Sequence, residues 1–450
     1  MIITIDGPAG TGKSTVAKLL AKRLRFIFFD TGAMYRAATL FVLRHHIPLH
    51  DERKIEKLFE TFSFTIGMNE MGEKTYFLQE EDVTLAIRSF EVTSAVSEIS
   101  AYACVRKLLV KEQREYARKN HAVFEGRDMG SVVFPKAELK IFLTASPSIR
   151  AERRYKELAE KFPNMALSLD PKTIEEDISR RDTLDSIRKI SPLICPKKAF
   201  VIDTTLMTPD EVVKKILSFG KERIQRSLSQ IRAPKRKMNF PYRLVIFIVQ
   251  NYFRLFYRLD VYGLEHFCEN AAILASNHVS YLDPPVVAVS APEEIHFLAR
   301  ESLFQLPFFG RFIRWMNSHP ITGGTAVVKI FRQIGNILAE GKKIIIFPEG
   351  TRSESGKMGP MRPGIAFLSY LNQVPIIPVY VQGTKDIWSR NRKWPKLFGK
   401  MICVFGSLID PKDFSSLSKK EAIDAISQRL EKSLVDLEKY CDEGALGLPP

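Results

Sequence analysis

The first residues that could do chemistry form a glycine-rich loop near the start of the chain. The run Gly7-Pro8-Ala9-Gly10-Thr11-Gly12-Lys13-Ser14 fits the pattern G-x-x-x-x-G-K-[ST] and lies between an apolar run and a helical pattern over residues 15–24. In such a loop, backbone N–H groups surround nucleotide phosphates, the lysine reaches the β- and γ-phosphates, and the serine hydroxyl can bind Mg²⁺. A glycine-rich turn without a ligand is the alternative, but the strand before the loop and the helix after it favour phosphate binding. We therefore predict an ATP site with Lys13 as a catalytic residue and Ser14 as the metal ligand, formed by Gly7, Pro8, Ala9, Gly10, Thr11, Gly12, Lys13, Ser14 and Thr15.

A histidine and an aspartate in the second half of the chain could act together as a general base. His278 and Asp283 are five residues apart, which on one regular helix would place them about 140° from each other. Pro284 indicates instead that a helix begins there, with Asp283 as its cap and His278 in the loop before it. An aspartate that accepts from one imidazole nitrogen fixes the tautomer and leaves the other nitrogen basic. Taken alone, this spacing is also compatible with a structural histidine beside a capping aspartate.

Two further patterns in the second half follow the His278–Asp283 pair in the sequence. The run Phe347-Pro348-Glu349-Gly350-Thr351-Arg352-Ser353 follows an apolar, strand-like segment, and Val374-Pro375-Ile376-Ile377-Pro378-Val379 comes later. A guanidinium group at Arg352 can bind a phosphate through paired hydrogen bonds. The alternative is that Glu349 and Arg352 form only an ion pair that stabilises a turn.

Length, composition and sequence periodicity indicate the domains that position these groups, and net charge indicates their partners. The 450 residues are 45% hydrophobic and 26% charged, which allows two or three folded units. Short β-like runs alternate with helical patterns both before and after a basic segment at about residues 219–243, so we predict two α/β domains. The net charge of +16 favours polyanions, phosphorylated substrates or an anionic membrane surface.

Cysteine usage and hydropathy point to a reducing compartment. The five cysteines are far apart and include no C-x-x-C pair, which argues against a disulfide framework and against a zinc site. The chain begins without a secretory signal pattern, and the longest apolar stretch, residues 244–253, is too short for a membrane-spanning helix. These features predict a cytoplasmic protein.

The first half resembles the bacterial cytidylate kinases over roughly residues 1–222. The resemblance rests on Asp30-Thr31-Gly32-Ala33-Met34-Tyr35-Arg36, on Glu125-Gly126-Arg127-Asp128-Met129-Gly130 and on Arg181-Asp182 with Asp185 and Arg188, in that order and spacing. It implies that the insertion at about residues 64–106 enlarges the monophosphate-binding region. It also implies a CMP site formed by Thr31, Arg36, Ser97, Arg106, Arg127, Asp128, Arg181, Asp185 and Arg188.

The resemblance further implies a lid and a metal site in the first half. Arg150, Arg153 and Arg154 lie on a helical stretch that resembles the lid of the family, and Arg153 and Arg154 are predicted to contact ATP, although a solvated helix face is the alternative. Glu125 stands where relatives commonly have aspartate, a position suited to holding a water bound to Mg²⁺. Several guanidinium groups and Mg²⁺ would offset the repulsion between the two phosphate groups.

The second half resembles the glycerophospholipid acyltransferases, and among them the lysophosphatidic acid acyltransferases, over about residues 240–408. The resemblance implies that His278 deprotonates the glycerol hydroxyl of lysophosphatidate, that Asp283 orients His278, and that the acyl donor is acyl-CoA or acyl carrier protein. It implies an acceptor site formed by Arg300, Glu349, Gly350, Thr351 and Arg352. Relatives usually carry an arginine shortly after the segment that here reads His319-Pro320-Ile321-Thr322-Gly323-Gly324-Thr325, and this chain has none there. Lys329 or Arg311 are candidate substitutes.

Together these patterns predict a bifunctional enzyme with a kinase domain at residues 1–222, a basic linker at 223–239 and an acyltransferase domain at 240–450. The kinase would phosphorylate CMP, and also dCMP, and the second domain would make phosphatidate.

An apolar and arginine-rich segment at residues 241–259 predicts peripheral contact with an anionic membrane at its inner face, with a helix buried in its own domain as the alternative. A kinase joined to a catalytically silent, membrane-binding domain is the alternative function. Because no zinc, helix-turn-helix or stacking motif accompanies the positive charge, we expect no nucleic-acid partner.

Overall fold

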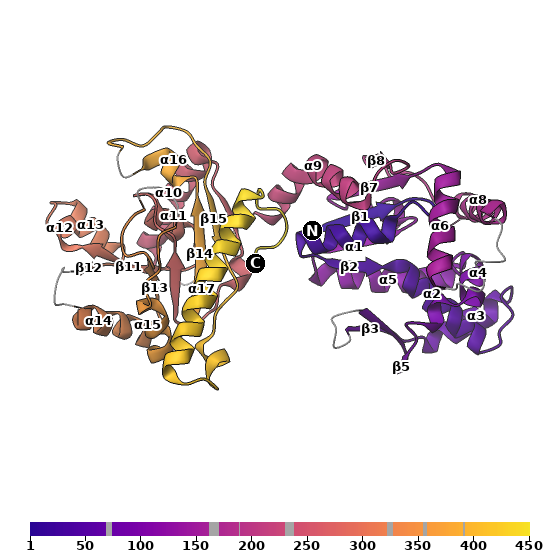
Figure 1. The fold of residues 1–450 in the computed structure, drawn as a ribbon, viewed down its shortest axis with the longest axis horizontal. Coiled ribbons are helices and arrows are strands. Elements are labelled where there is room, and N and C mark those ends of the chain that lie inside the picture. The colour runs from indigo at the N-terminus through magenta and orange to yellow at the C-terminus, as the bar shows by residue number, and fades with distance from the viewer. Residues whose placement is uncertain are drawn as a thin grey trace. The chain divides into compact units, whose positions relative to one another are not determined.

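The computed structural model describes residues 1–68, 74–161, 171–188, 190–229, 238–321, 327–353, 358–389 and 392–450. The chain divides into two compact units, Met1–Ser227 and Leu228–Pro450, and each is an α/β fold (Figure 1). Helix α9 (Pro209–Leu228) extends into the segment predicted as a linker, and residues 230–237 of that segment lie outside the described residues.

The first unit is built on a five-stranded parallel sheet with the order β2-β6-β1-β7-β8. The central strand is buried along most of its length because its residues are mainly isoleucine, in agreement with the predicted strand at the start of the chain. The strands are β1 (Ile2–Asp6), β2 (Ile27–Asp30), β6 (Ala122–Gly126), β7 (Leu139–Thr144) and β8 (Phe200–Asp203). Parallel pairing places the carboxyl ends of all five strands at one edge, where the phosphate loop follows β1.

Helices cover this sheet, and a small antiparallel sheet, β3-β4-β5, belongs to the predicted insertion (Figure 1). A five-residue π-helix, η3 (Met129–Val133), follows β6. The remaining elements of the unit are α1 (Lys13–Leu24), α2 (Thr31–Arg44), α3 (Glu52–Leu58), η1 (Phe59–Thr61), β3 (Phe64–Met68), β4 (Lys74–Leu78), β5 (Glu81–Asp82), η2 (Ala86–Arg88), α4 (Phe90–Ile99), α5 (Ala103–Lys119), α6 (Pro147–Lys161) and α8 (Pro171–Ile187).

Glycine is required where the phosphate loop leaves β1. Gly7 has a φ of +146°, and a Cβ atom there would be much closer to the Leu143 carbonyl oxygen than van der Waals contact allows. The loop can therefore pass close to β7 only because position 7 has no side chain.

The second unit contains a seven-stranded sheet with the order β12-β11-β13-β10-β14-β15-β9. The first five strands in this order are parallel, and β15 runs antiparallel to β14. The strands are β9 (Asp260–Tyr262), β10 (Ala272–Ser276), β11 (Ile295–Arg300), β12 (Ser318–Ile321), β13 (Lys343–Ile346), β14 (Ile376–Gln382) and β15 (Ile402–Phe405). The predicted runs at 271–275, 343–347 and 376–381 correspond to β10, β13 and β14.

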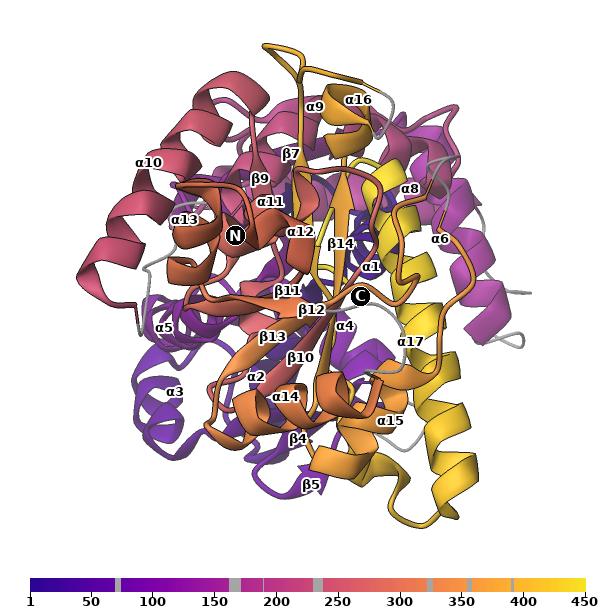
Figure 2. The same ribbon diagram turned by 90° about the vertical axis from the view of Figure 1, so that its left-hand side faces the viewer.

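Helices lie on both faces of this sheet (Figure 2). Side chains of α10 and α11 join one face of the sheet in a single apolar cluster, and α14, α15 and α17 contact β13, β10 and β14. The helices and short turns of the unit are α10 (Phe240–Tyr257), η4 (Leu264–His266), α11 (Asp283–Ser290), α12 (Glu301–Phe304), α13 (Phe309–Trp315), α14 (Val327–Ala339), α15 (Gly364–Asn372), α16 (Thr384–Trp388), η5 (Pro411–Phe414) and α17 (Lys419–Asp442).

Helix α10 has one buried apolar face and one exposed apolar face. Tyr242, Ile246 and Phe253 are buried in the core of the unit, whereas Phe247 and Leu255 are 63% and 74% exposed. Phe253 therefore belongs to the core, and so does Leu259 directly after the helix. The buried-helix alternative therefore describes one face of α10, and membrane contact through the exposed face stays a prediction. Within the part of the chain that the structure describes, no helix is long and apolar enough to cross a membrane.

Candidate functional site

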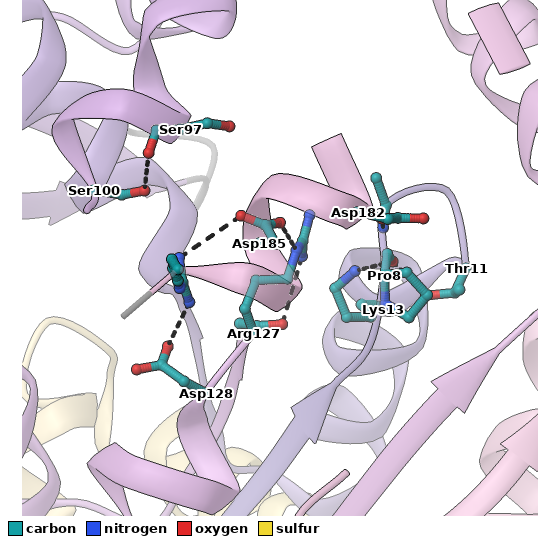
Figure 3. Close-up of polar contacts among 12 residues, drawn as sticks. Pro8, Thr11, Lys13, Ser97, Ser100, Arg127, Asp128, Asp182 and Asp185 are labelled. Carbon is teal, nitrogen blue, oxygen red and sulfur yellow. Dashed lines mark hydrogen bonds and ion pairs between the residues drawn. The ribbon is translucent and has the colours of Figure 1, made fainter. Parts of the chain in front are cut away.

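The phosphate loop of the first unit holds a buried lysine at the start of α1. Lys13 donates a hydrogen bond to the carbonyl oxygen of Pro8 at 2.6 Å, and the Thr11 hydroxyl donates to the same oxygen at 3.0 Å (Figure 3). Burial lowers the pKa of Lys13, and the nearby Arg127 lowers it further. The carboxylates of Glu125, Asp182 and Asp185 oppose this shift only in part, so a nucleotide phosphate would add negative charge that favours the ammonium form.

Oxygen atoms beside the loop fit a divalent cation. Burial raises the pKa of Glu125, the Asp30 carboxylate raises it further, and a hydrogen bond from Ser14 opposes the shift. Glu125 Oε2 is buried and has no hydrogen-bond partner among the described residues. A serine hydroxyl beside carboxylate oxygens is the donor set that Mg²⁺ prefers, so these residues fit the predicted metal. The described residues contain no group of three or more histidine, cysteine, aspartate or glutamate side chains that could hold a metal ion by themselves.

Arginine and aspartate side chains form a network next to the loop (Figure 3). Arg106 and Asp128 make a buried ion pair, and Arg127 Nε donates to Asp185 Oδ2 at 3.0 Å. Arg188 lies between the two aspartates, 3.9 Å from Asp128 and 3.7 Å from Asp185. Three guanidinium groups face two carboxylates, so the network keeps excess positive charge for a bound phosphate group.

Other residues predicted for the CMP site are held by local hydrogen bonds. The Thr31 hydroxyl donates to the carbonyl oxygen of Glu125 at 2.6 Å, and Arg36 forms an ion pair with Asp30 at 3.0 Å. Ser97 lies in α4, and its carbonyl oxygen accepts a hydrogen bond from the Ser100 hydroxyl. The side chain of Arg181 lies outside the described residues.

The three predicted lid arginines of α6 have different partners. Arg150 is buried, pairs with Asp182 of α8, and donates to the carbonyl oxygen of Ala9 in the phosphate loop. Arg153 donates to the backbone oxygen of Thr204 at 2.7 Å, so it lies beside the loop after β8. Arg154 pairs with Glu157 on its own helix, as the solvated-face alternative predicts. The ATP contacts of Arg153 and Arg154 remain predictions.

Two acidic residues shape this site although no site role was predicted for them; one of them, Asp182, belongs to the residues that carry the resemblance. Asp6, at the end of β1, accepts hydrogen bonds from the backbone N–H groups of Met129 and Gly130 at 2.7 Å, and burial raises its pKa to about 6. Asp182 accepts from the N–H group of Ala9 at 3.2 Å. An aspartate directly after a buried apolar strand was a sequence signal for Asp6, whereas the contact of Asp182 depends on the fold alone.

The second unit brings His278 and Asp283 together in the loop after β10. His278 Nδ1 lies 2.9 Å from Asp283 Oδ2, and the imidazole ring stacks on Phe347 with ring centroids 4.0 Å apart. The same carboxylate oxygen accepts the N–H groups of Val279 and Ser280 at 2.7 Å. The predicted contact between His278 and Asp283 is therefore present. It occupies Nδ1, so Nε2 is the imidazole nitrogen that can act as a general base.

The prediction that Asp283 caps the following helix was wrong in one respect. Helix α11 begins at Asp283 itself, and its N-cap is Leu282. The Asp283 side chain turns back toward the N–H groups of Val279 and Ser280 and toward the imidazole. Because the carboxylate is fully buried there, it needs these hydrogen-bond donors in place of water.

Glu349 positions the loop that carries His278. Its Oε1 accepts the N–H group of His278 at 2.9 Å, and its Oε2 accepts the N–H group of Gly359 at 3.0 Å. The N–H group of Ser353 donates to the carbonyl oxygen of His278 at 2.9 Å. Both oxygens of Glu349 are thus engaged by the backbone, and its predicted contact with an acyl acceptor remains a prediction.

Arginine side chains surround the turn after β13. Arg352 lies over the ring of Tyr281, 3.6 Å from its centroid, and Arg352 Nη1 is buried without a hydrogen-bond partner among the described residues. Gly350 and Thr351 are exposed, as is Arg300 at the end of β11. The exposed Arg362, which sequence reasoning missed, lies against Gly350, where a Cβ atom would come within 3.1 Å of the guanidinium carbon. The predicted replacements for the missing arginine, Lys329 and Arg311, lie in α14 and α13, and residues 322–326 lie outside the described residues.

Comparison with known proteins agrees with both units. The family model "Cytidylate kinase" matches residues 3–222, and the family model "Acyltransferase" matches residues 258–382. The chain is 51% identical to a cytidylate kinase of Protochlamydia amoebophila over 49% of this chain and 96% of that protein. It is 46% identical to a cytidylate kinase of Listeria innocua over 50% of this chain and 97% of that protein.

The solved structures that match have low sequence identity and TM-scores below 0.5. The 1-acyl-sn-glycerophosphate (LPA) acyltransferase PlsC from Thermotoga maritima is 23% identical over 52% of this chain and 84% of its own length, with a TM-score of 0.36. A shikimate kinase from Aquifex aeolicus is 15% identical over 49% of this chain and 97% of its own, with a TM-score of 0.22. Through residues 3–222 the chain belongs to the cytidylate kinase family, and its second half carries an acyltransferase domain.

Proposed function

We propose that the chain is a bifunctional enzyme that phosphorylates CMP, and also dCMP, with ATP and transfers an acyl group to lysophosphatidate. The observation that carries the proposal is the presence of two separate sites of matching chemistry, one in each unit. The first joins a phosphate loop to an arginine–aspartate network, and the second joins a His278–Asp283 pair to a cationic turn.

The first site suits transfer of a phosphoryl group between two nucleotides. Lys13 and the loop N–H groups would hold the phosphates of ATP, and Ser14 with Glu125 would hold Mg²⁺, which supplies charge neutralisation between the two substrates. The arginines would bind the phosphate of CMP, and Asp128 and Asp185 would bind its sugar. Since that phosphate is ionised at neutral pH, no protein base is needed, and positioning supplies most of the rate.

Replacement of Lys13 tests the kinase. Lys13→Met is expected to lower kcat for CDP formation by at least about 100-fold, because the ammonium group stabilises charge on the transferred phosphoryl group. Lys18→Met is the matched control, since Lys18 lies exposed on the same helix. Equal rates for the Lys13→Met variant and the wild-type chain would contradict the assigned role of Lys13. A wild-type chain that phosphorylates neither CMP nor dCMP would contradict the activity.

The second site suits base-assisted attack of a hydroxyl group on a thioester. Asp283 binds Nδ1 of His278, so Nε2 can take the proton from the glycerol hydroxyl as its oxygen bonds to the acyl carbon. The tetrahedral intermediate collapses with cleavage of the carbon–sulfur bond, and the proton on Nε2 passes to the departing thiolate. The products are phosphatidate and the free thiol of coenzyme A or of acyl carrier protein.

Three arginines could bind the phosphate of the acceptor. Arg352 has a buried nitrogen without a hydrogen-bond partner among the described residues, Arg362 lies beside Gly350, and Arg300 ends strand β11, which pairs with β13. All three lie at the edge of the sheet where His278 follows β10. Arg362 is the candidate for the arginine that the segment at 319–325 lacks. A bound phosphate would hold the hydroxyl group near Nε2 and so lower the entropic barrier.

Acyl transfer is tested with labelled palmitoyl-CoA and palmitoyl-acyl carrier protein as donors and lysophosphatidate as acceptor. The wild-type chain is expected to form phosphatidate, and His278→Ala is expected to form none. His266→Ala serves as the control, because the ring of His266 bonds to the carbonyl oxygen of Phe405, away from the pair. If the wild-type chain forms no product from either donor, the second unit is not an active acyltransferase, and the membrane-binding alternative is favoured.

We also propose that the exposed face of α10 contacts anionic membranes. Phe240, Phe247 and Leu255 are exposed, and Arg243 and Arg254 lie on the same helix. Apolar side chains can enter the headgroup boundary while arginines bind anionic lipids. The Phe247→Glu/Leu255→Glu variant is expected to lose binding to phosphatidylglycerol vesicles, whereas Val435→Glu on α17 keeps it. Unchanged binding of the double variant would contradict this proposal.

A further inference from the structure

We propose that Thr384 is a positioning residue for the His278–Asp283 pair, an inference that rests on the acyl transfer proposed above. The Thr384 hydroxyl donates a hydrogen bond to Asp283 Oδ1 at 2.6 Å. Thr384 and Asp283 are both fully buried, so no solvent competes for this contact. Neither the predicted motifs nor the spacing of His278 and Asp283 includes this residue.

The two oxygens of the Asp283 carboxylate have unequal sets of donors. Oδ2 accepts from His278 Nδ1 and from the N–H groups of Val279 and Ser280. Oδ1 accepts from Thr384, the one donor that the structure gives it within the described part of the chain. A carboxylate held only through Oδ2 could rotate about its carbon–carbon bond, and the Thr384 hydroxyl prevents this rotation. It therefore fixes the direction in which Oδ2 faces the imidazole.

The fold holds Thr384 at this place through a second contact of the same short helix. Helix α16 begins at Thr384, and its last residue, Trp388, accepts a hydrogen bond from the Ser280 hydroxyl at 2.6 Å. Both ends of α16 are thus attached to the turn that carries His278. Gly383 has a φ of +86°, and a Cβ atom there would overlap the carbonyl oxygen of Lys400, so the chain enters α16 at a fixed angle. This arrangement gives α16 the function of a brace for the catalytic pair.

The mechanistic consequence concerns the direction of the imidazole and not the binding of substrate. If Asp283 rotates, Nδ1 loses its partner, and the ring can turn Nε2 away from the hydroxyl group of the acceptor. Misplacement of a catalytic group by about 1 Å can lower a rate by about 100-fold. We therefore expect loss of the Thr384 hydroxyl to lower kcat and to leave KM for lysophosphatidate nearly unchanged.

The test compares Thr384→Val, Thr384→Ser and Ser369→Ala in the full chain. The valine variant is expected to lose about 10- to 100-fold in kcat of acyl transfer, with KM within about twofold of wild type. The serine variant, which restores the hydroxyl, is expected to stay within about threefold of the wild-type kcat. Ser369→Ala removes a buried hydroxyl of the same unit that bonds to the carbonyl oxygen of Val374, and it should keep the wild-type kcat. CDP formation by the first unit measures the amount of chain in each sample, and thermal unfolding shows whether the second unit of each variant is folded.

A spectroscopic measurement separates this inference from the proposed activity. The His278 Nδ1 proton, assigned by its absence in His278→Ala, should give a downfield proton resonance that shifts in Thr384→Val and stays in place in Ser369→Ala. If the wild-type chain transfers no acyl group, this resonance still tests the brace. If the valine variant does not fold, Thr384→Ala removes the hydroxyl without a second branched methyl group. Wild-type kcat and an unshifted resonance in the valine or alanine variant would overturn the inference, as would equal losses in the valine and serine variants.

Discussion

Replacement of Glu349 by glutamine distinguishes two roles for this residue. The carboxylate accepts one hydrogen bond from the N–H group of His278 and one from that of Gly359, at 2.9 and 3.0 Å. Glutamine keeps one acceptor oxygen, and its NH₂ group faces the other N–H donor. Glu349→Gln therefore loses one hydrogen bond to a charged group, worth about 1.5–3 kcal/mol, and leaves a backbone N–H group unpaired.

The expected effect follows from the place of that loss. Because one donor belongs to the backbone of His278, misplacement of the base lowers kcat, and 1.5–3 kcal/mol corresponds to about 10- to 150-fold in rate. If Glu349 instead bound the acyl acceptor, KM would rise while kcat stayed constant. The same substitution therefore gives different kinetic results for the two roles.

The assay measures release of the coenzyme A thiol at varied concentrations of lysophosphatidate. Glu340→Gln is a matched control, because Glu340 is an exposed glutamate of the same unit that pairs with Lys342. A rise in KM at constant kcat would refute the positioning role of Glu349. A wild-type kcat and KM would refute both roles.

Two further variants test buried charge in each unit. Asp128→Asn leaves the buried guanidinium group of Arg106 without its counter-ion. We expect it to lower the free energy of unfolding of the first unit by about 3 kcal/mol and to raise KM for CMP. Thermal unfolding and CDP formation measure these effects, and an unchanged unfolding temperature would contradict the first. Burial, together with His319, lowers the pKa of His296 from 6.5 to about 4, so the unfolded chain binds a proton there at a higher pH than the folded chain does. Stability of the second unit should therefore fall by up to about 3 kcal/mol as the pH drops from 6.5 to 4. His296→Gln should reduce this dependence in urea titrations, and an equally steep dependence would contradict the assignment.

Residues close together in sequence made much of the fold and of both sites predictable. The phosphate loop combines its glycines, Lys13 and Ser14 in eight consecutive positions, and three of the five residues in the strand before it are isoleucine. The contact between His278 and Asp283 could be predicted because Pro284 excludes a regular helix across the pair. In each case the residues that carry the prediction lie within eight consecutive positions.

Contacts between distant segments could not be predicted in this way. Thr384 reaches Asp283 across 101 positions, and Asp182 reaches Ala9 across 173. Such pairs depend on which strands become neighbours in the sheet, and no local pattern specifies that order. For the same reason, the hydrogen bonds from the backbone to both Glu349 oxygens could not be predicted. Gly359, which donates one of them, has no distinguishing pattern in the sequence.

The division of the chain into two compact units has a consequence for the cell that makes it. A single polypeptide supplies both sites, so their numbers stay equal whatever the rate of expression or degradation. Regulation of synthesis cannot change one activity relative to the other. The balance between the two reactions must therefore be set by turnover numbers and by the supply of each substrate.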